Sequence, residues 1–136
     1  MPIIYLSPST QEWNYYVNGG TEEEYMNLLA DKMVPYLDAS GIRYIRNTPD
    51  MTAASSIAAS NAGNFDLHVA LHSNAAPEGR YGQAQGSIVF YYPGSEQGRR
   101  AAEIIANGLK AIYPRPNLVW AESTTTIGEV RRVRAP

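Results

Sequence analysis

The stretch that decides the fold runs from Asp66 to Asn74 and reads DLHVALHSN. Its middle, Leu67 to Leu71, is a short apolar run, and such a run between polar residues indicates a buried β-strand. His72 follows where that strand gives way to a loop. A neutral imidazole at a strand end is a natural zinc ligand, but a histidine there is more often a hydrogen-bonded residue of a turn.

Strand and helix patterns alternate on both sides of this segment. Short apolar runs predict strands, and apolar residues at helical spacing predict helices. Strands are expected at 2–7, 42–45, 66–72, 87–92 and 118–120, and helices at 21–40, 51–61 and 95–112. This alternation predicts an α/β fold with a mostly parallel sheet and helices on both faces. A chain of 136 residues fits one such domain, spanning residues 1–136.

The first predicted helix has clear signals at both ends. Thr21 followed by Glu24 has the spacing of a capping box, and Gly41 suits the left-handed position after a helix. The three glutamates at 22–24 occupy the first turn, where carboxylates interact favourably with the helix dipole. Composition alone does not single out one of the three as a functional residue.

A functional site is expected at the carboxyl ends of the parallel strands. The loop at 8–20, the start of the first helix and the end of the strand at 66–72 all meet there, so the helix-start glutamates and His72 become candidates. His68 lies four residues earlier on the same strand face, about 13 Å from His72 at about 3.3 Å per residue. One metal with bonds of about 2 Å cannot reach both histidines, so His68 is expected to be a buried supporting residue.

The composition excludes several classes of function. The chain has no cysteine, which rules out a disulfide framework and a thiolate metal site. A formal net charge of −2 argues against nucleic acid as a partner, because phosphate binding needs a cationic face. No stretch approaches the roughly 20 apolar residues of a membrane span. Residues 1–7 lack the features of a signal peptide, so we expect a protein made in the cytoplasm.

Two other functions of α/β proteins lack their motifs in this sequence. Residues 8–11 read Pro-Ser-Thr-Gln where a dinucleotide-binding domain has its glycine-rich turn. The sequence also has no G-x-S-x-G segment, which is the nucleophile turn of many serine hydrolases. Nucleotide binding and serine hydrolysis are therefore both disfavoured.

An ordered set of motifs resembles the zinc-dependent N-acetylmuramoyl-L-alanine amidases of the third amidase family. The motifs lie at 23–28, 41–47, 60–61 and 72–75, and the last reads His-Ser-Asn-Ala. The resemblance implies that Glu23 and His72 bind Zn²⁺, and it points to Asn74 as a substrate-binding residue. It also implies peptidoglycan as the partner, with a zinc-activated water cleaving the amide bond between N-acetylmuramic acid and L-alanine at the cell wall.

The sequence departs from that family in two places. Where the family has a histidine ligand in an Asp-Pro-Gly-His-Gly segment, residues 7–11 read Ser-Pro-Ser-Thr-Gln. This resembles a divergent branch, in which Gln11 is the candidate third zinc ligand. The family's catalytic glutamate follows a further strand, so it is expected beyond Pro136, together with the last strand and helix. Glu122 and Glu129 do not match its position.

These departures leave two functions open. The first is a peptidoglycan amidase whose catalytic glutamate lies outside this sequence. The alternative is a non-catalytic remnant of the same fold that binds the cell wall, which the replacement of the first ligand favours.

Overall fold

The computed structural model describes residues 1–74 and 85–136, which fall into two compact units. The first unit comprises Met1–Ala75 with Val133–Ala135, and the second comprises Ala76–Arg132 with Pro136. The predicted alternation of strands and helices is confirmed throughout the described residues. The expectation of a single domain stays a prediction.

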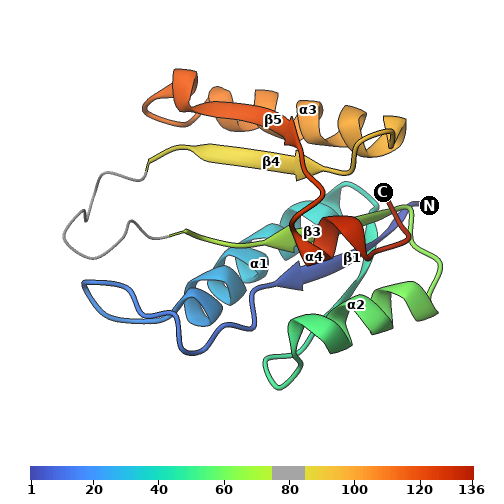
Figure 1. The fold of residues 1–136 in the computed structure, drawn as a ribbon, viewed down its shortest axis with the longest axis horizontal. Coiled ribbons are helices and arrows are strands. Elements are labelled where there is room, and N and C mark those ends of the chain that lie inside the picture. The colour runs from blue at the N-terminus through green and yellow to red at the C-terminus, as the bar shows by residue number, and fades with distance from the viewer. Residues whose placement is uncertain (75–84) are drawn as a thin grey trace. The chain divides into compact units, whose positions relative to one another are not determined.

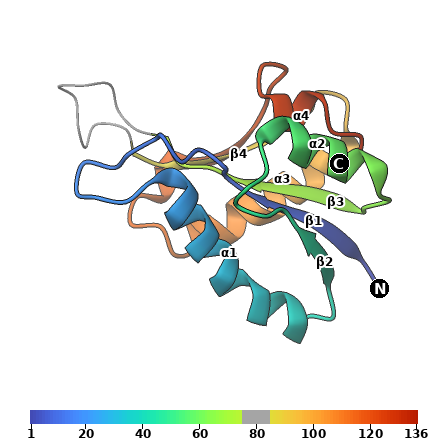
Figure 2. The same cartoon turned by 90° about the horizontal axis from the view of Figure 1, so that it is seen from below.

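The first unit is built around a parallel sheet of three strands. Its elements are β1 (Ile3–Pro8), α1 (Glu22–Ala39), β2 (Arg43–Arg46), α2 (Ala53–Ala62) and β3 (Leu67–Leu71). The strands lie in the order β2-β1-β3, so β1 is central (Figures 1 and 2). In the register, Tyr5 lies opposite Ile45 on one side and His68 on the other. Central position explains why β1 is buried from Ile4 onward, whereas β2 at the edge alternates between exposed and half-buried residues.

Helices α1 and α2 cover opposite faces of this sheet (Figures 1 and 2). The strand order requires the two helices to lie on opposite faces. The chain leaves β1 toward one side to form β2, and it then crosses back past β1 to form β3. Parallel connections are almost always right-handed, so reversing the direction moves the second helix to the other face. The carboxyl ends of β1 and β3 thereby form a topological switch point, the usual place for a site in such sheets.

The ends of α1 follow the sequence signals. The Thr21 side chain accepts a hydrogen bond from the Glu24 amide at 3.2 Å. At the other end Gly41 has a φ of +69°, and the Ile42 amide donates to the Leu37 carbonyl at 3.0 Å. These contacts satisfy backbone groups that a helix end otherwise leaves unpaired.

A buried polar cluster joins the end of β1 to the start of α2. Asn47, directly after β2, donates through Nδ2 to the Pro8 carbonyl at 3.0 Å, to Ser56 Oγ at 3.0 Å and to Ser7 Oγ at 3.3 Å. The Asn47 amide also donates to the Leu6 carbonyl at 3.1 Å. The side chains of Ser7, Asn47 and Ser56 are buried. The side-chain amide of Asn47 therefore takes the place of water for the Pro8 carbonyl and the two serine hydroxyls.

The second unit is a smaller strand-helix-strand arrangement. It contains β4 (Ser87–Tyr91), α3 (Glu96–Lys110), the 3₁₀ turn η1 (Pro116–Leu118), β5 (Val119–Ser123) and α4 (Gly128–Arg131). Strands β4 and β5 pair in parallel, with Ser87 opposite Val119. Ser95 caps α3 by accepting from the Gly98 amide at 3.1 Å. The short helix α4 was not predicted, since four residues are too few to establish a helical period.

No helix within residues 1–74 and 85–136 has the length and apolar character needed to cross a membrane.

Replacing Asn47 tests the buried polar cluster. We expect Asn47→Ala to lower the free energy of unfolding by about 2 kcal/mol, because it leaves buried groups without their partner. Urea unfolding followed by circular dichroism measures this loss. Asn64→Ala, at an exposed position, should change stability by less than about 0.5 kcal/mol. Equal effects of the two substitutions would contradict the role given to Asn47.

Candidate active site

The site forms around the carboxylate of Glu22, the first residue of α1. The Glu22 side chain is only 1% exposed, although glutamate is among the residues least often buried. The Glu22 amide donates to the Asn14 carbonyl at 2.9 Å. The loop after β1 therefore fixes the backbone from which the carboxylate extends.

Three polar groups surround the Glu22 carboxylate. Oε2 accepts from Asn14 Nδ2 at 2.8 Å. Oε1 accepts from the Ser73 amide at 2.9 Å and lies 3.1 Å from Nδ1 of His72. Burying an ionised carboxylate is costly unless such partners replace water, so these contacts explain how the group is tolerated inside the unit. They also hold the carboxylate in one orientation.

His72 follows β3 directly, at the carboxyl edge of the sheet. Its backbone continues into Ser73, whose amide is bonded to the same carboxylate oxygen that His72 Nδ1 approaches. Glu22 thus holds both the imidazole and the chain segment that carries it. The contact at Nδ1 restricts rotation of the ring.

The loop after β1 is itself tied to the end of β3. Tyr15 pairs with Thr21 in an isolated antiparallel bridge, and the Tyr16 amide donates to the Gly20 carbonyl at 2.9 Å. The Tyr16 hydroxyl is hydrogen-bonded to Ser73 Oγ, and its ring packs against Tyr25 with centroids 4.9 Å apart. A glycine is required at position 20, where φ is +80° and a Cβ atom would lie 2.4 Å from the Tyr25 ring.

The structure brings His72 to Glu22, not to Glu23. Glu23 Oε1 instead accepts from Asn27 Nδ2 at 3.3 Å along α1. Asn27 in turn accepts from Arg46 through its side-chain oxygen at 3.0 Å and its carbonyl at 2.9 Å. Glu23 thereby takes part in a contact between α1 and the end of β2. No sequence signal separated these two neighbours, because both lie in the same acidic turn.

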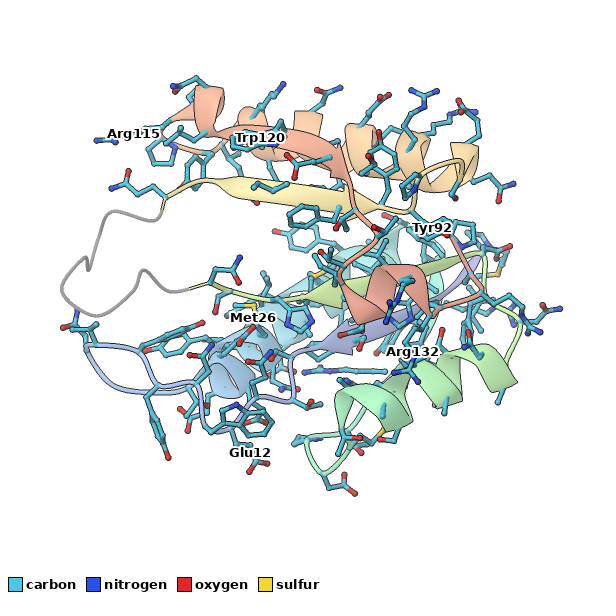
Figure 3. The ribbon with its side chains drawn as sticks, viewed as in Figure 1. Glu12, Met26, Tyr92, Arg115, Trp120 and Arg132 are labelled. Atoms are coloured by element: carbon cyan, nitrogen blue, oxygen red, sulfur yellow. The ribbon has the colours of Figure 1, made fainter. Side chains whose placement is uncertain are left out.

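The other predicted site residues lie close to this region. Gln11 is half-buried in the loop after β1; its carbonyl accepts from the Glu23 amide at 3.4 Å, and its own amide donates to Ser9 Oγ at 3.2 Å. Asn74 is exposed two residues after His72. Glu12, the other carboxylate of this loop, is also exposed (Figure 3).

His68 occupies a packing position on β3, where it is half-buried and not buried as the sequence suggested. Its ring stacks on Tyr5 with centroids 5.3 Å apart and an interplanar angle of 13°. Nδ1 of His68 lies 2.9 Å from Ser60 Oγ of α2. These contacts join β3 to β1 and α2, so His68 supports the sheet beneath the site.

The described part of the chain contains no complete cluster of metal-binding side chains. Across residues 1–74 and 85–136, no three His, Cys, Asp or Glu side chains are grouped so that they could hold a metal ion. Glu22 and His72 provide a pair of such groups. Glu122 and Glu129 belong to the second unit, where Glu122 Oε1 accepts from the Trp120 indole at 3.1 Å.

Several solved structures share the fold, including two amidases. The chain is similar to the N-acetylmuramoyl-L-alanine amidase AmiC2 of Nostoc punctiforme, with 14% identity and a TM-score of 0.77 over 99% of this chain and 75% of that one. It is also similar to the CwlD amidase from Clostridioides difficile, solved in complex with the GerS lipoprotein, with 15% identity and a TM-score of 0.77 over 100% of this chain and 79% of that one. No curated protein matches significantly.

A family profile identifies the chain more directly than these structures do, since identities this low show the fold alone. The profile Amidase_3, described as N-acetylmuramoyl-L-alanine amidase, matches residues 10–131. This range includes Glu22, His72 and the loop that holds them. The chain therefore belongs to the N-acetylmuramoyl-L-alanine amidase family Amidase_3.

Proposed function

We propose that this chain hydrolyses the amide bond between N-acetylmuramic acid and L-alanine in peptidoglycan, at the site formed by Glu22 and His72. One observation carries the proposal: a buried carboxylate and an imidazole lie 3.1 Å apart at the switch point of the sheet. Family membership over residues 10–131 supports the reaction and the substrate.

We further propose that Glu22 and His72 are two ligands of a Zn²⁺ ion, with Glu22 taking the place first assigned to Glu23. Two bonds of about 2 Å at a tetrahedral angle place ligand atoms about 3.3 Å apart. The separation of 3.1 Å between Glu22 Oε1 and His72 Nδ1 suits such a pair. A third ligand is needed, and the side-chain oxygen of Gln11 in the adjoining loop remains the candidate. When bound, zinc polarises a carbonyl and lowers the pKa of a water molecule to about 7.

The surrounding residues act by orienting these two groups. Asn14 Nδ2 and the Ser73 amide hold the carboxylate at 2.8 and 2.9 Å, so its position is set before any ligand arrives. Outer hydrogen bonds of this kind fix metal-ligand orientation and commonly change metal affinity about 10- to 100-fold when removed. Tyr16 acts one step further out, by holding Ser73 through its hydroxyl.

A second candidate is a wall-binding protein of the same fold that lacks the metal. The contacts of Glu22 favour it: both carboxylate oxygens already have partners within the protein. The incomplete cluster of His, Cys, Asp and Glu side chains among the described residues points the same way. Zinc content and hydrolysis, measured on the same preparation, separate the two candidates.

Substitution of the neighbouring glutamates tests which one binds the metal. We expect Glu22→Gln to lower zinc content from about one ion per chain to near zero, because an amide oxygen is a neutral and weaker ligand. Glu23→Gln is the matched control and should retain zinc, since Glu23 bonds along its own helix. Atomic absorption after dialysis gives the stoichiometry. Loss of zinc only in Glu23→Gln would return the ligand to that residue.

Substitutions of the two histidines should likewise differ in their effects on zinc binding and on stability. His72→Ala is expected to abolish zinc binding with little change in the thermal midpoint. His68→Ala is expected to retain zinc but lose about 1 to 2 kcal/mol of stability, because its stacking on Tyr5 and its bond to Ser60 disappear. Zinc stoichiometry and the thermal midpoint are measured for both variants. Zinc loss in His68→Ala with an unchanged midpoint would reverse these assignments.

Hydrolysis is tested directly on purified peptidoglycan. Cleavage exposes the amino group of L-alanine, which N-terminal labelling detects. We expect its release in zinc buffer once the segment that carries the general base is present, with a loss of about 100-fold or more in His72→Ala or in the presence of a chelator. Binding to peptidoglycan without release of alanine amino groups, in protein that contains no zinc, would establish the second candidate instead.

A further inference from the structure

Side chains in the loop after β1 alternate between inward and outward positions. Asn14 and Tyr16 are directed inward, where they bond to Glu22 and Ser73. Trp13 and Tyr15 are each 73% exposed, and Val17 is also exposed. Trp13 and Val17 lie in turns on either side of Tyr15, and the inward bonds of Asn14 and Tyr16 leave the odd-numbered side chains in solvent.

This arrangement leaves large apolar side chains exposed close to one another in the sequence. Single exposed apolar residues are ordinary, but a group of them with polar surroundings marks an interaction site. Here three residues in a run of five are exposed, and two are aromatic. We name the side chains of Trp13 and Tyr15 the aromatic platform.

The backbone beneath the aromatic platform is fixed. Asn14 is bonded to Glu22 through both its carbonyl and its side chain. Tyr15 pairs with Thr21, and a turn from Tyr16 to Gly19 closes through a bond of 3.2 Å. A ligand that binds the platform therefore pays little to order the loop, which favours affinity.

The charge around the platform selects among classes of ligand. Residues 13–20 contain no charged side chain, and the first Lys or Arg of the chain is Lys32. The nearest charged residues along the sequence are acidic, at Glu12 and at the start of α1. Anionic lipid surfaces and nucleic acids require cationic residues, so they are disfavoured. A neutral ligand with apolar faces fits better, and sugar rings have this character because their axial C–H groups form an apolar face that can lie on an aromatic ring.

We propose that the aromatic platform binds the glycan part of peptidoglycan by stacking Trp13 and Tyr15 on its sugar rings. This rests on the proposed function in one respect: peptidoglycan is the ligand expected at Glu22 and His72. Asn14, between the two platform residues, is bonded to Glu22, so the platform adjoins the place where the muramyl amide would be cleaved. A sugar held there would position the bond attached to it.

The test uses glycan strands from which the peptides have been removed, so that no scissile bond is present. Binding to the full chain is measured by calorimetry with chelator added, which makes the result independent of zinc. Trp13→Ala and Tyr15→Ala should each weaken binding about tenfold, and Trp13→Phe should retain most of it. Trp120→Ala, at a tryptophan 39% exposed on β5 (Figure 3), and Tyr36→Ala, at a tyrosine 78% exposed on α1, are the matched controls and should bind as the wild type does.

A spectroscopic measurement gives an independent readout. The chain has two tryptophans, so Trp120→Phe leaves Trp13 as the sole indole emitter. Its emission should shift to shorter wavelength when glycan strands are added, because stacking removes the indole from water. Unchanged affinity in both platform variants, or no shift in emission, would overturn the proposal. Binding of neutral lipid vesicles that requires the same two residues, without binding of glycan, would overturn it in favour of a membrane surface.

The platform and the amidase proposal can fail separately. Glycan binding that depends on Trp13 and Tyr15, without release of alanine amino groups from intact peptidoglycan, supports the platform and rejects the hydrolase. Hydrolysis with an unchanged KM in Trp13→Ala and Tyr15→Ala rejects the platform and keeps the hydrolase. If both hold, KM should rise about tenfold in these variants while kcat stays within about twofold, because the stacked sugar is bound equally before and during reaction.

Discussion

The buried carboxylate of Glu22 is the group on which the rest of the site depends. It bonds at once to the loop after β1, through Asn14, and to the end of β3, through Ser73 and His72. Removing a carboxylate from water costs several kcal/mol unless protein groups replace the lost hydrogen bonds. The three contacts provide that replacement, and the same need for partners forces two segments that are far apart in sequence to meet at one place.

The order of the strands makes this meeting possible. Because β1 lies between β2 and β3, the connections after β1 and β2 run in opposite directions and leave on opposite faces. The loop after β1 and the segment after β3 are then neighbours at one sheet edge. A buried polar cluster centred on Asn47 links the end of β1 to α2 through hydrogen bonds. The fold thus supplies a fixed edge, and side chains at that edge supply the chemistry.

Much of this fold could be predicted from local signals, and the site only in part. The Thr21 cap, the glycine at 41 and the Ser95 cap set helix ends through contacts within a few residues, which a sequence records directly. His72 could be placed because the end of an apolar strand is also a local feature, although β3 is half-buried and not buried as its sequence suggested. The choice between Glu22 and Glu23 depends on which carboxylate faces a segment about fifty residues away. The sequence of one acidic turn does not indicate which of two neighbouring glutamates makes such a long-range contact. The inward bond of Asn14 depends on the same long-range contact.

The alternation along residues 13–17 divides the loop into positions that tolerate substitution and positions that do not. Even-numbered side chains are committed to the interior, so exchanging them would disturb the carboxylate and the strand end together. Odd-numbered side chains touch solvent, and a new residue there leaves the frame unchanged. Selection, or a protein engineer, can therefore alter what the loop recognises by varying positions 13, 15 and 17, while the arrangement of Glu22 and His72 is inherited intact.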